Sequence, residues 1–343
     1  MIRLRRIIWS AALIAAPALA SNITVSVHDF SDLDGWSQDQ HDQALGAFVE
    51  TCPDLKSADW QPLCAIAQHT DDAKTFFQAF FKPVMIRDGD DAKFTGYFEP
   101  EMTVSRVRTA KYAYPIYRVP PELPKSGVWY SRAELENRGI LRNRGLEIAW
   151  ASDPVDVLFL QIQGSGRLRF TDGHSQRIGY GGGNGHQYRS VGQEMIRRGL
   201  LGKHQASAAS IKKWVRANPE RGRGLLQHNP SFVFFRELNV PETKGPLGAM
   251  NRSLTTKRTV AIDPEYVPLG APVWIETQGA KPLRRLMIAQ DTGSVIKGAQ
   301  RADIFMGSGA AAGKEASKIK DAGSLFVLLP VKRALSLLDQ NDP

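Results

Sequence analysis

Two aspartates near the C-terminal end of the chain are the residues whose spacing points most directly to chemistry. Asp291 and Asp303 lie 12 residues apart, and each is flanked by short apolar runs, with a glycine-rich turn between them. This pattern is typical of two strand ends that present carboxylates at one place. A carboxyl group against apolar surroundings has a raised pKa and can hold a proton near neutral pH, as acid–base catalysis requires. Both residues are therefore candidate acid–base groups.

The same stretch, Asp291-Thr292-Gly293, also matches half of an aspartic protease site. That chemistry needs two such aspartates that share a proton. The sequence contains no second Asp-Thr-Gly or Asp-Ser-Gly, and chains that form the pair by dimerisation are far shorter. The motif therefore favours a different carboxyl chemistry.

The N-terminus predicts export. Three arginines within the first six residues precede an apolar run from Ile7 to Ala16 and a cleavage site, Ala18-Leu19-Ala20. This is typical of a secretory signal peptide over residues 1–20, and the run is too short to span a bilayer. The alternatives are an uncleaved anchor and a buried first helix. No later segment is long and apolar enough to span, and no cysteine lies near Ser21 for lipid attachment, so we expect a soluble periplasmic protein.

The two cysteines and the charge balance fit that compartment. Cys52 and Cys64 are expected to form a disulfide, with free thiols as the alternative, and the seven histidines form no metal-ligand pattern near them. Without the three leader arginines the formal net charge falls from +9 to +6. Scattered lysines and arginines without a binding motif disfavour nucleic acid as a partner. Acidic peptidoglycan fits better, although a merely soluble basic surface is an alternative.

Apolar spacing predicts a chain that is helical at first and then mainly β. Helices are expected within residues 37–82, from a Ser190 cap through Met195 to Leu200, and over Ala208–Ala217. Strands are expected at 94–98, 114–119, 157–163, 232–235, 259–262, 273–275, 286–289 and 325–329. If residues 157–163 are a strand, Gln161 and Gln163 face one side of it and can bind sugar hydroxyls. The alternative is that this side of the sheet is merely exposed to solvent. Residues 179–186 are expected to form a glycine-rich loop.

An ordered set of motifs resembles the lytic murein transglycosylase A family from about residue 35 to residue 330. The segments are Phe94-Thr-Gly-Tyr-Phe-Glu-Pro, Leu160-Gln-Ile-Gln-Gly-Ser-Gly, Asn184-Gly-His-Gln-Tyr-Arg-Ser and Asn229-Pro-Ser-Phe-Val-Phe-Phe. Val260-Ala-Ile-Asp263-Pro-Glu-Tyr-Val-Pro-Leu-Gly270, Asp291-Thr-Gly and Asp303-Ile-Phe resemble the family's three-aspartate (3D) domain. The order of these segments is far more specific than any one of them.

This resemblance implies a fold that is mainly β with helices, in two domains. Residues 21–98 and 235–343 would form a discontinuous domain with a double-psi β-barrel, including a 3D domain at about 240–330. Residues 99–234 would form an inserted β domain, and a groove between the two domains would hold a glycan strand. The absence of a linker-like segment agrees with an insertion.

The resemblance also implies a reaction that needs no metal or organic cofactor. The enzyme would cleave the bond from N-acetylmuramic acid to N-acetylglucosamine in peptidoglycan without water, leaving 1,6-anhydro ends. Asp303 corresponds to the catalytic acid, Asp291 would tune it, and Asp263 is expected to be structural. The predicted substrate-binding residues are Thr95, Tyr97, Gln161, Gln163, Ser165 and Tyr188. Besides glycan strands, cell-wall synthesis proteins are candidate partners.

Two other functions remain open on the sequence. One is a non-catalytic, expansin-like peptidoglycan-binding protein. The other is a glycoside hydrolase in which Asp291 is the second catalytic carboxylate.

Overall fold

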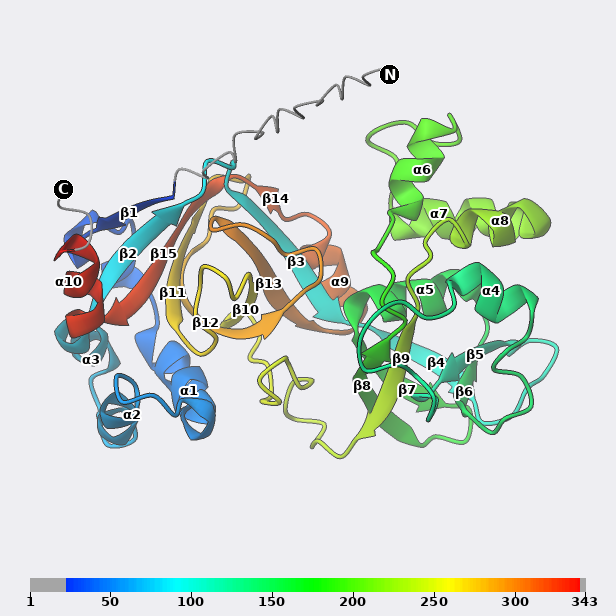
Figure 1. Ribbon diagram of the computed structural model, residues 1–343, viewed down its shortest axis with the longest axis horizontal. Helices are drawn as coiled ribbons and strands as arrows, with labels where there is room; N and C mark the ends of the chain where they lie inside the picture. The colour runs from blue at the N-terminus through cyan, green and yellow to red at the C-terminus, as the bar shows by residue number, and fades with distance from the viewer. Residues whose placement is uncertain (1–22, 340–343) are drawn as a thin grey trace, which may run out of the picture.

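The computed structural model describes residues 23–339, so the predicted leader at residues 1–20 lies outside the described part. Two β-sheets, each with its own helices, occupy the two ends of an elongated molecule (Figure 1). The prediction of a mainly β protein with helices and an inserted second unit is confirmed. Within residues 23–339, no helix is both long and apolar enough to cross a membrane.

The first sheet has nine strands and curls around on itself (Figure 1). Its strands, in sheet order, are β1 (Thr24–Val27), β2 (Phe81–Arg87), β15 (Gly323–Pro330), β11 (Pro272–Thr277), β12 (Arg284–Thr292), β10 (Thr259–Ile262), β13 (Arg301–Ser308), β3 (Lys93–Glu99) and β14 (Lys320–Asp321). The β10–β12 and β13–β3 pairs are parallel, and the other pairs are antiparallel. The sheet therefore combines segments from both ends of the chain.

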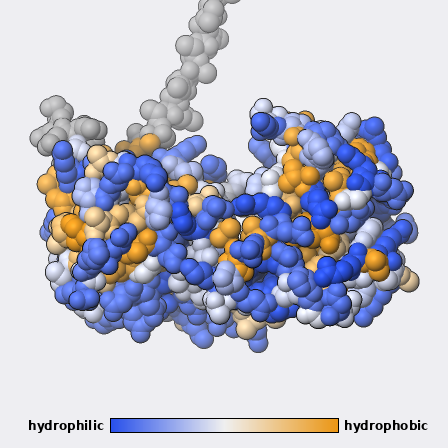
Figure 2. All heavy atoms as spheres, turned by 90° about the horizontal axis from the view of Figure 1, so that it is seen from below, coloured by the Kyte–Doolittle hydropathy of each residue, from blue (hydrophilic) through white to orange (hydrophobic). Residues whose placement is uncertain are grey.

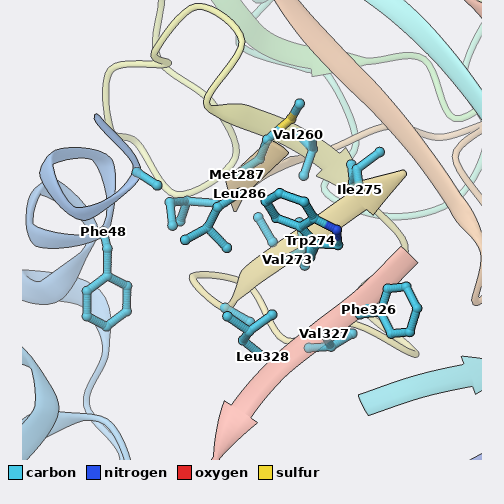
Figure 3. Close-up of a cluster of buried hydrophobic side chains, with 14 of the residues drawn as sticks. Phe48, Val260, Val273, Trp274, Ile275, Leu286, Met287, Phe326, Val327 and Leu328 are labelled. Atoms are coloured by element: carbon cyan, nitrogen blue, oxygen red, sulfur yellow. The ribbon is translucent and has the colours of Figure 1, made fainter. Parts of the chain in front are cut away.

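Five helices belong to this unit and cover its core. They are α1 (His41–Thr51), α2 (Gln61–Ala67), α3 (Ala73–Phe80), α9 (Gly309–Ala316) and α10 (Val331–Asp339). Trp274 lies fully buried among Val273, Leu286 and Phe326, and Phe48 of α1 belongs to the same cluster (Figure 3). Consecutive residues of β11, β12 and β15 are buried in this cluster, so both faces of these strands are covered.

The second sheet has six strands and lies in the inserted part of the chain. In sheet order these are β5 (Tyr114–Tyr117), β6 (Glu147–Ala151), β4 (Glu101–Ser105), β7 (Ser165–Phe170), β8 (Ser175–Gly183) and β9 (Val233–Leu238). Its helices are α4 (Arg132–Asn137), α5 (Pro154–Gln163), α6 (Val191–Arg197), α7 (Ala208–Ala217) and α8 (Pro219–Leu226). The chain thus leaves the first sheet after β3 and returns to it at β10.

Two local predictions are wrong. Residues 157–163 lie in α5 and not in a strand, because Asp153 caps the helix by accepting from the Val155 amide and Pro154 occupies its first position. Most of the predicted glycine loop is strand, because β8 continues to Gly183 and pairs with β9. The Ser190 cap is correct, although the helix after it is α6 and ends at Arg197.

A buried ion pair joins the two sheets where the chain passes between them. Glu99, the last residue of β3, is fully buried and accepts from Arg177 Nε at 2.7 Å and Nη2 at 3.2 Å. Ser308, at the end of β13, donates to the same carboxylate at 2.5 Å. Arg177 also donates to the Pro241 carbonyl at 3.1 Å, in the segment that leads back to the first sheet. Both crossings are therefore tied to one buried charge.

We expect that Arg177→Met lowers the free energy of unfolding by about 3 kcal/mol, because it leaves the Glu99 carboxylate buried without its main partner. Urea unfolding of the purified protein measures the change. The double variant Glu99→Gln/Arg177→Met should recover much of the loss, since no buried charge remains. If the double variant loses as much free energy of unfolding as Glu99→Gln and Arg177→Met lose together, the ion pair does not account for the effect.

A disulfide joins the end of α1 to α2. Cys52 follows α1 directly, Cys64 lies in α2, and their Cα atoms are 5.5 Å apart. The bridge closes a loop over a sequence separation of 12 residues. Both cysteines are buried in the main core.

Removing this bridge with Cys52→Ala/Cys64→Ala should lower the free energy of unfolding by about 2–3 kcal/mol, because the unfolded chain regains the freedom that the loop restricts. Thermal and urea unfolding check the value. Wild-type protein unfolded with a reducing agent is the matched control and should show a similar loss. Equal stability of oxidised and reduced protein would contradict the expectation.

Candidate active site

Asp291 and Asp303 lie in one row across four neighbouring strands. Ala261 of β10 pairs with Asp291 of β12 on one side and with Asp303 of β13 on the other. Asp303 in turn pairs with Thr95 of β3. Paired residues point to the same face of a sheet, and two strand spacings separate the aspartate Cα atoms by about 10 Å. The fold therefore brings both carboxylates to the same face, as their spacing predicts.

An irregularity in β12 puts Asp291 into this row. Val260 pairs with Ala289, but the next residue, Ala261, pairs with Asp291, so Gln290 has no partner on β10. The extra residue changes the alternation and turns the Asp291 side chain to the face that Asp303 uses. Gln290 is fully buried, and its amide nitrogen donates to Thr51 Oγ1 at 2.8 Å and to the Ala47 carbonyl at 3.2 Å. Helix α1 thereby anchors the bulge.

Asp303 has one engaged and one open carboxyl oxygen. Thr95 Oγ1 donates to Oδ1 at 2.7 Å, and Arg301 Nη2 donates to the same threonine oxygen at 2.8 Å. Arg301 thereby orients the Thr95 hydroxyl toward the carboxylate. Among residues 23–339, no hydrogen bond is made to Oδ2 of Asp303, and the side chain is only half-buried. That oxygen can therefore exchange a proton with a bound molecule.

Both oxygens of Asp291 are engaged by the protein. Tyr97 OH donates to Oδ2 at 2.8 Å, and the amides of Ala249 and Thr292 each donate to Oδ1 at 2.9 Å. Gly248 permits this approach, because a Cβ there would lie 2.8 Å from the Gln290 carbonyl and 3.3 Å from the Asp291 carboxyl carbon. Asp291 is thus more tightly held than Asp303.

Burial governs the titration of this group of residues. Burial raises the pKa of Asp303 above its usual value, against the Thr95 hydrogen bond and the charge of Arg301. Burial also raises the pKa of Asp291, against hydrogen bonds from Tyr97 and two amides, and the charge of Asp303 adds to the rise. The pKa of Tyr97 is raised well above 10 by burial and then by Asp291, so Tyr97 stays a donor. The site can therefore hold a carboxylic acid at a pH where an exposed aspartate is ionised.

The predicted substrate-binding residues are not all at this site. Thr95 and Tyr97 contact the aspartates directly, and Gln163 accepts from the Phe98 amide at 3.0 Å. Gln161 lies about 200° from Gln163 around helix α5 and points elsewhere. It is buried, and its carbonyl oxygen accepts from Arg132. The shared strand face predicted for the two glutamines is therefore wrong.

Ser165 and Tyr188 lie in the inserted unit. Ser165 is buried at the start of β7, directly after the end of α5. Tyr188 is half-buried in the loop before α6. The Asn184 side chain organises this region, since it donates to the carbonyls of Tyr130 at 2.8 Å and Pro230 at 2.9 Å. None of the hydrogen bonds described for residues 23–339 connects Ser165 or Tyr188 to either aspartate.

Sequence reasoning missed Arg301 and the segment at 248–249. Arg301 had a usable signal, because it lies two residues before Asp303 and therefore shares its strand face. Ala249 had none, since its amide reaches Asp291 from 42 positions away in the chain. Asp263 is buried and accepts from the Gly298 amide at 3.0 Å and from Lys297 at 3.1 Å, which agrees with the predicted structural role.

Three cavities of the described chain, near Arg177, Val49 and Arg284, contain neither aspartate of the row. The outline of the molecule is indented between its two lobes (Figure 2). Within residues 23–339, no group of three or more His, Cys, Asp or Glu side chains is placed to hold a metal ion.

The raised pKa of Asp303 predicts how stability depends on pH. The unfolded carboxyl titrates near 3.8 and the folded one above it, so ionisation costs stability as the pH rises through that window. Asp303→Asn avoids this cost. Its stability relative to wild type should therefore increase from pH 3 toward neutrality, as measured by urea unfolding at several pH values. A stability difference that does not change with pH would contradict the raised pKa.

Comparison with known families gives two matches that together cover most of the chain. The MltA specific insert domain matches residues 93–236. The 3D domain matches residues 258–329, which include Asp263, Asp291 and Asp303. These matches coincide with the inserted second sheet and with the C-terminal half of the first sheet.

Relatives and solved structures agree with these matches. The chain is 36% identical over 250 residues to membrane-bound lytic murein transglycosylase A of Escherichia coli K12, an alignment covering 69% of this chain and 66% of the relative. A crystal structure of MltA from Neisseria gonorrhoeae superposes with a TM-score of 0.79 at 33% identity and covers 90% of this chain and 93% of its own. The structure of E. coli MltA with bound chitohexaose has a TM-score of 0.73 at 27% identity, covering 89% of this chain and 94% of its own. This chain belongs to the MltA family of lytic murein transglycosylases.

Proposed function

We propose that this protein cleaves the β-1,4 bond from N-acetylmuramic acid to N-acetylglucosamine in peptidoglycan without water and leaves 1,6-anhydromuramic acid ends. The observation that carries the proposal is Asp303, a half-buried aspartate with a raised pKa and one carboxyl oxygen that accepts no hydrogen bond from residues 23–339. The E. coli relative with bound chitohexaose supports an extended glycan as the ligand.

One carboxyl group suffices for both halves of this reaction. The protonated Asp303 gives its proton to the glycosidic oxygen, and the bond from that oxygen to C1 of the muramic acid breaks. The resulting carboxylate takes the proton of the C6 hydroxyl of the same sugar. The C6 oxygen then bonds to C1, which closes the anhydro ring and restores the carboxylic acid. No water is consumed.

The neighbours of Asp303 suit a group that changes protonation during the reaction. The Thr95 hydroxyl holds Oδ1 and leaves Oδ2 to face the substrate, while Arg301 holds the threonine. Asp291 is a poor nucleophile or base because three donors already occupy its oxygens. We assign it the role of positioning Tyr97, which favours a single-acid mechanism over a two-carboxylate hydrolase.

We further propose that glycan sugars lie across the face that carries the aspartate row. Thr95, Tyr97 and Gln163 surround that face and are the strongest of the predicted binding residues. Ser165 and Tyr188 would contact more distant sugars. Gln161 is excluded as a direct contact because its side chain is buried and its carbonyl oxygen accepts from Arg132.

The proposal includes a place of action and a division of the chain. We assign residues 21–98 and 235–343 to the unit with the aspartates and residues 99–234 to the inserted unit. The predicted leader and peptidoglycan as substrate both indicate the periplasm. The relatives are named as membrane-bound. Cell fractionation would test both the export of this chain and its attachment to a membrane.

We expect that Asp303→Asn loses at least about 10²-fold in turnover, the usual contribution of a general acid–base group. Asparagine keeps the size of the side chain and can still bond to Thr95, but it cannot transfer a proton. The assay is release of soluble fragments from purified sacculi, with the products identified by mass spectrometry. Anhydro ends indicate a transglycosylase, reducing ends indicate a hydrolase, and no release indicates a binding protein.

Two variants make the result specific to Asp303. Asp291→Asn should be milder, because Asp291 does not exchange a proton in this mechanism. Asp59→Asn, which removes an exposed carboxylate outside the site, should keep full activity. A folded Asp303→Asn protein with wild-type turnover would refute the single-acid mechanism, and an equally severe loss in Asp291→Asn would favour two catalytic carboxylates.

A further inference from the structure

The positive charge of this protein is concentrated in one helical segment. Residues 189–228, here called the basic segment, contain nine lysines and arginines and two glutamates, a formal net charge of +7. Arg3, Arg5, Arg6 and Asp342 lie outside the described residues. Without these four, the net charge of the whole chain falls from +9 to +7, which equals the charge of the basic segment. The remainder of residues 23–339 is therefore neutral on balance, and the excess charge belongs to this segment.

The basic segment is a folded platform. Helices α6, α7 and α8 pack around Val191, Met195, Ile211, Val215 and Leu225, which are all buried. Figure 1 shows these helices projecting beyond the second sheet, above α5. Eight of the nine cationic side chains are exposed, and Lys212 is half-buried. The core of the platform thus holds the charges outward at defined positions.

Only part of this charge is neutralised by neighbouring carboxylates. Glu194 pairs with Arg197 at 2.7 Å and with Arg198 at 2.6 Å. Asp156 of α5 pairs with Lys212 at 2.5 Å, and Asp153, the cap of α5, pairs with Arg216 at 2.7 Å. Five cations of the basic segment have no carboxylate partner within ion-pair distance among residues 23–339, and they are Arg189, Lys203, Lys213, Arg221 and Arg223. Arg223 donates to Asn137 Oδ1 at 2.7 Å and Arg221 lies over the Trp214 ring, so Arg189, Lys203 and Lys213 are the cations most available to an anionic partner.

The surface chemistry favours a carboxylate-bearing polymer over a lipid bilayer. Helices that bind membranes combine cations with exposed apolar anchors. None of the large hydrophobic side chains that are exposed within residues 23–339 lies in the basic segment. Its one tryptophan, Trp214, is half-buried and lies beneath the guanidinium of Arg221 at 5.5 Å. The platform therefore offers charge without a means of insertion.

Helix α5 links the platform to the aspartate row. Near its first turn, Asp153 and Asp156 pair with α7, and at its last residue Gln163 accepts from the Phe98 amide of β3. A helix of 10 residues spans about 15 Å. A polymer held across the aspartates can thus place a side branch on the platform.

We propose that the basic segment binds the carboxylates of the peptide stems of peptidoglycan, while the sugars of the same strand lie on the aspartate row. This inference rests on the proposed function, because it takes peptidoglycan as the substrate. Two weak contacts on one polymer reinforce each other, since the second binding event becomes intramolecular. The platform would select peptide-bearing glycan over bare glycan.

The test compares two triple variants that each remove three positive charges. Arg189→Gln/Lys203→Gln/Lys213→Gln removes free cations of the basic segment, and Lys125→Gln/Lys281→Gln/Lys332→Gln removes exposed lysines elsewhere. Both are made in the Asp303→Asn protein so that binding is measured without turnover. At about 50 mM salt the basic-segment variant should bind intact sacculi roughly tenfold more weakly than the control, with a shallower dependence on salt. On glycan stripped of peptides by an amidase, the two variants should bind equally.

Each other outcome overturns the inference in a recognisable way. Equal binding of the two variants to intact sacculi would show that the basic segment does not contact the polymer. Weaker binding on stripped glycan as well would assign the segment to sugar recognition or to the fold, which thermal unfolding of the variant separates. If the basic-segment variant binds more weakly than the control only to phosphatidylglycerol vesicles, the surface is a membrane-binding site. Failure of the proposed function is a separate result, because it appears as sacculi without anhydro ends after treatment with the unsubstituted protein.

Discussion

The buried carboxylate of Glu99 is the constraint on which the arrangement of the two units depends. A charge without solvent is tolerated only where opposite charge and hydrogen bonds replace water, and here Arg177 and Ser308 supply them. Arg177 comes from the second sheet and Ser308 from β13 of the first. The two sheets therefore cannot separate at this point without breaking the ion pair and the hydrogen bond that compensate this carboxylate.

The same two strands carry the proposed chemistry. Thr95 and Tyr97 precede Glu99 on β3, and Asp303 precedes Ser308 on β13. One end of this parallel pair is thus fixed by the ion pair, while the other presents the carboxyl group and the hydroxyl that orients it. Gly96 lets helix α9 pack directly on β3, since a Cβ there would lie 2.8 Å from the Ala316 Cα. Rigid backbone on both sides is what a proton donor requires if its free oxygen is to meet one bond of a long polymer.

Charge is divided between the two units in a way that suits an anionic polymer. Burial raises the pKa of both carboxyl groups of the aspartate row, which weakens the tendency of the row to repel such a polymer. The cations lie at the far end of α5, where they are exposed and surrounded by water. Recognition by charge and catalysis by a neutral acid can therefore operate on the same strand without opposing each other.

The sequence by itself determined the family, the mainly β fold, the cysteine pair and the two aspartates, because motifs in order and local apolar periodicity are properties of the chain alone. It could not determine which residues share a face. One unpaired residue, Gln290, reverses the alternation that places Asp291, and its cause lies in contacts with α1 more than 200 positions earlier. Residues 157–163 satisfy both a strand and a helix pattern by composition, and only the cap at Asp153 and the packing of α5 decide that Gln161 turns inward to Arg132. Glu99 appears as one more surface charge in the sequence, since burial depends on partners brought together by the whole fold.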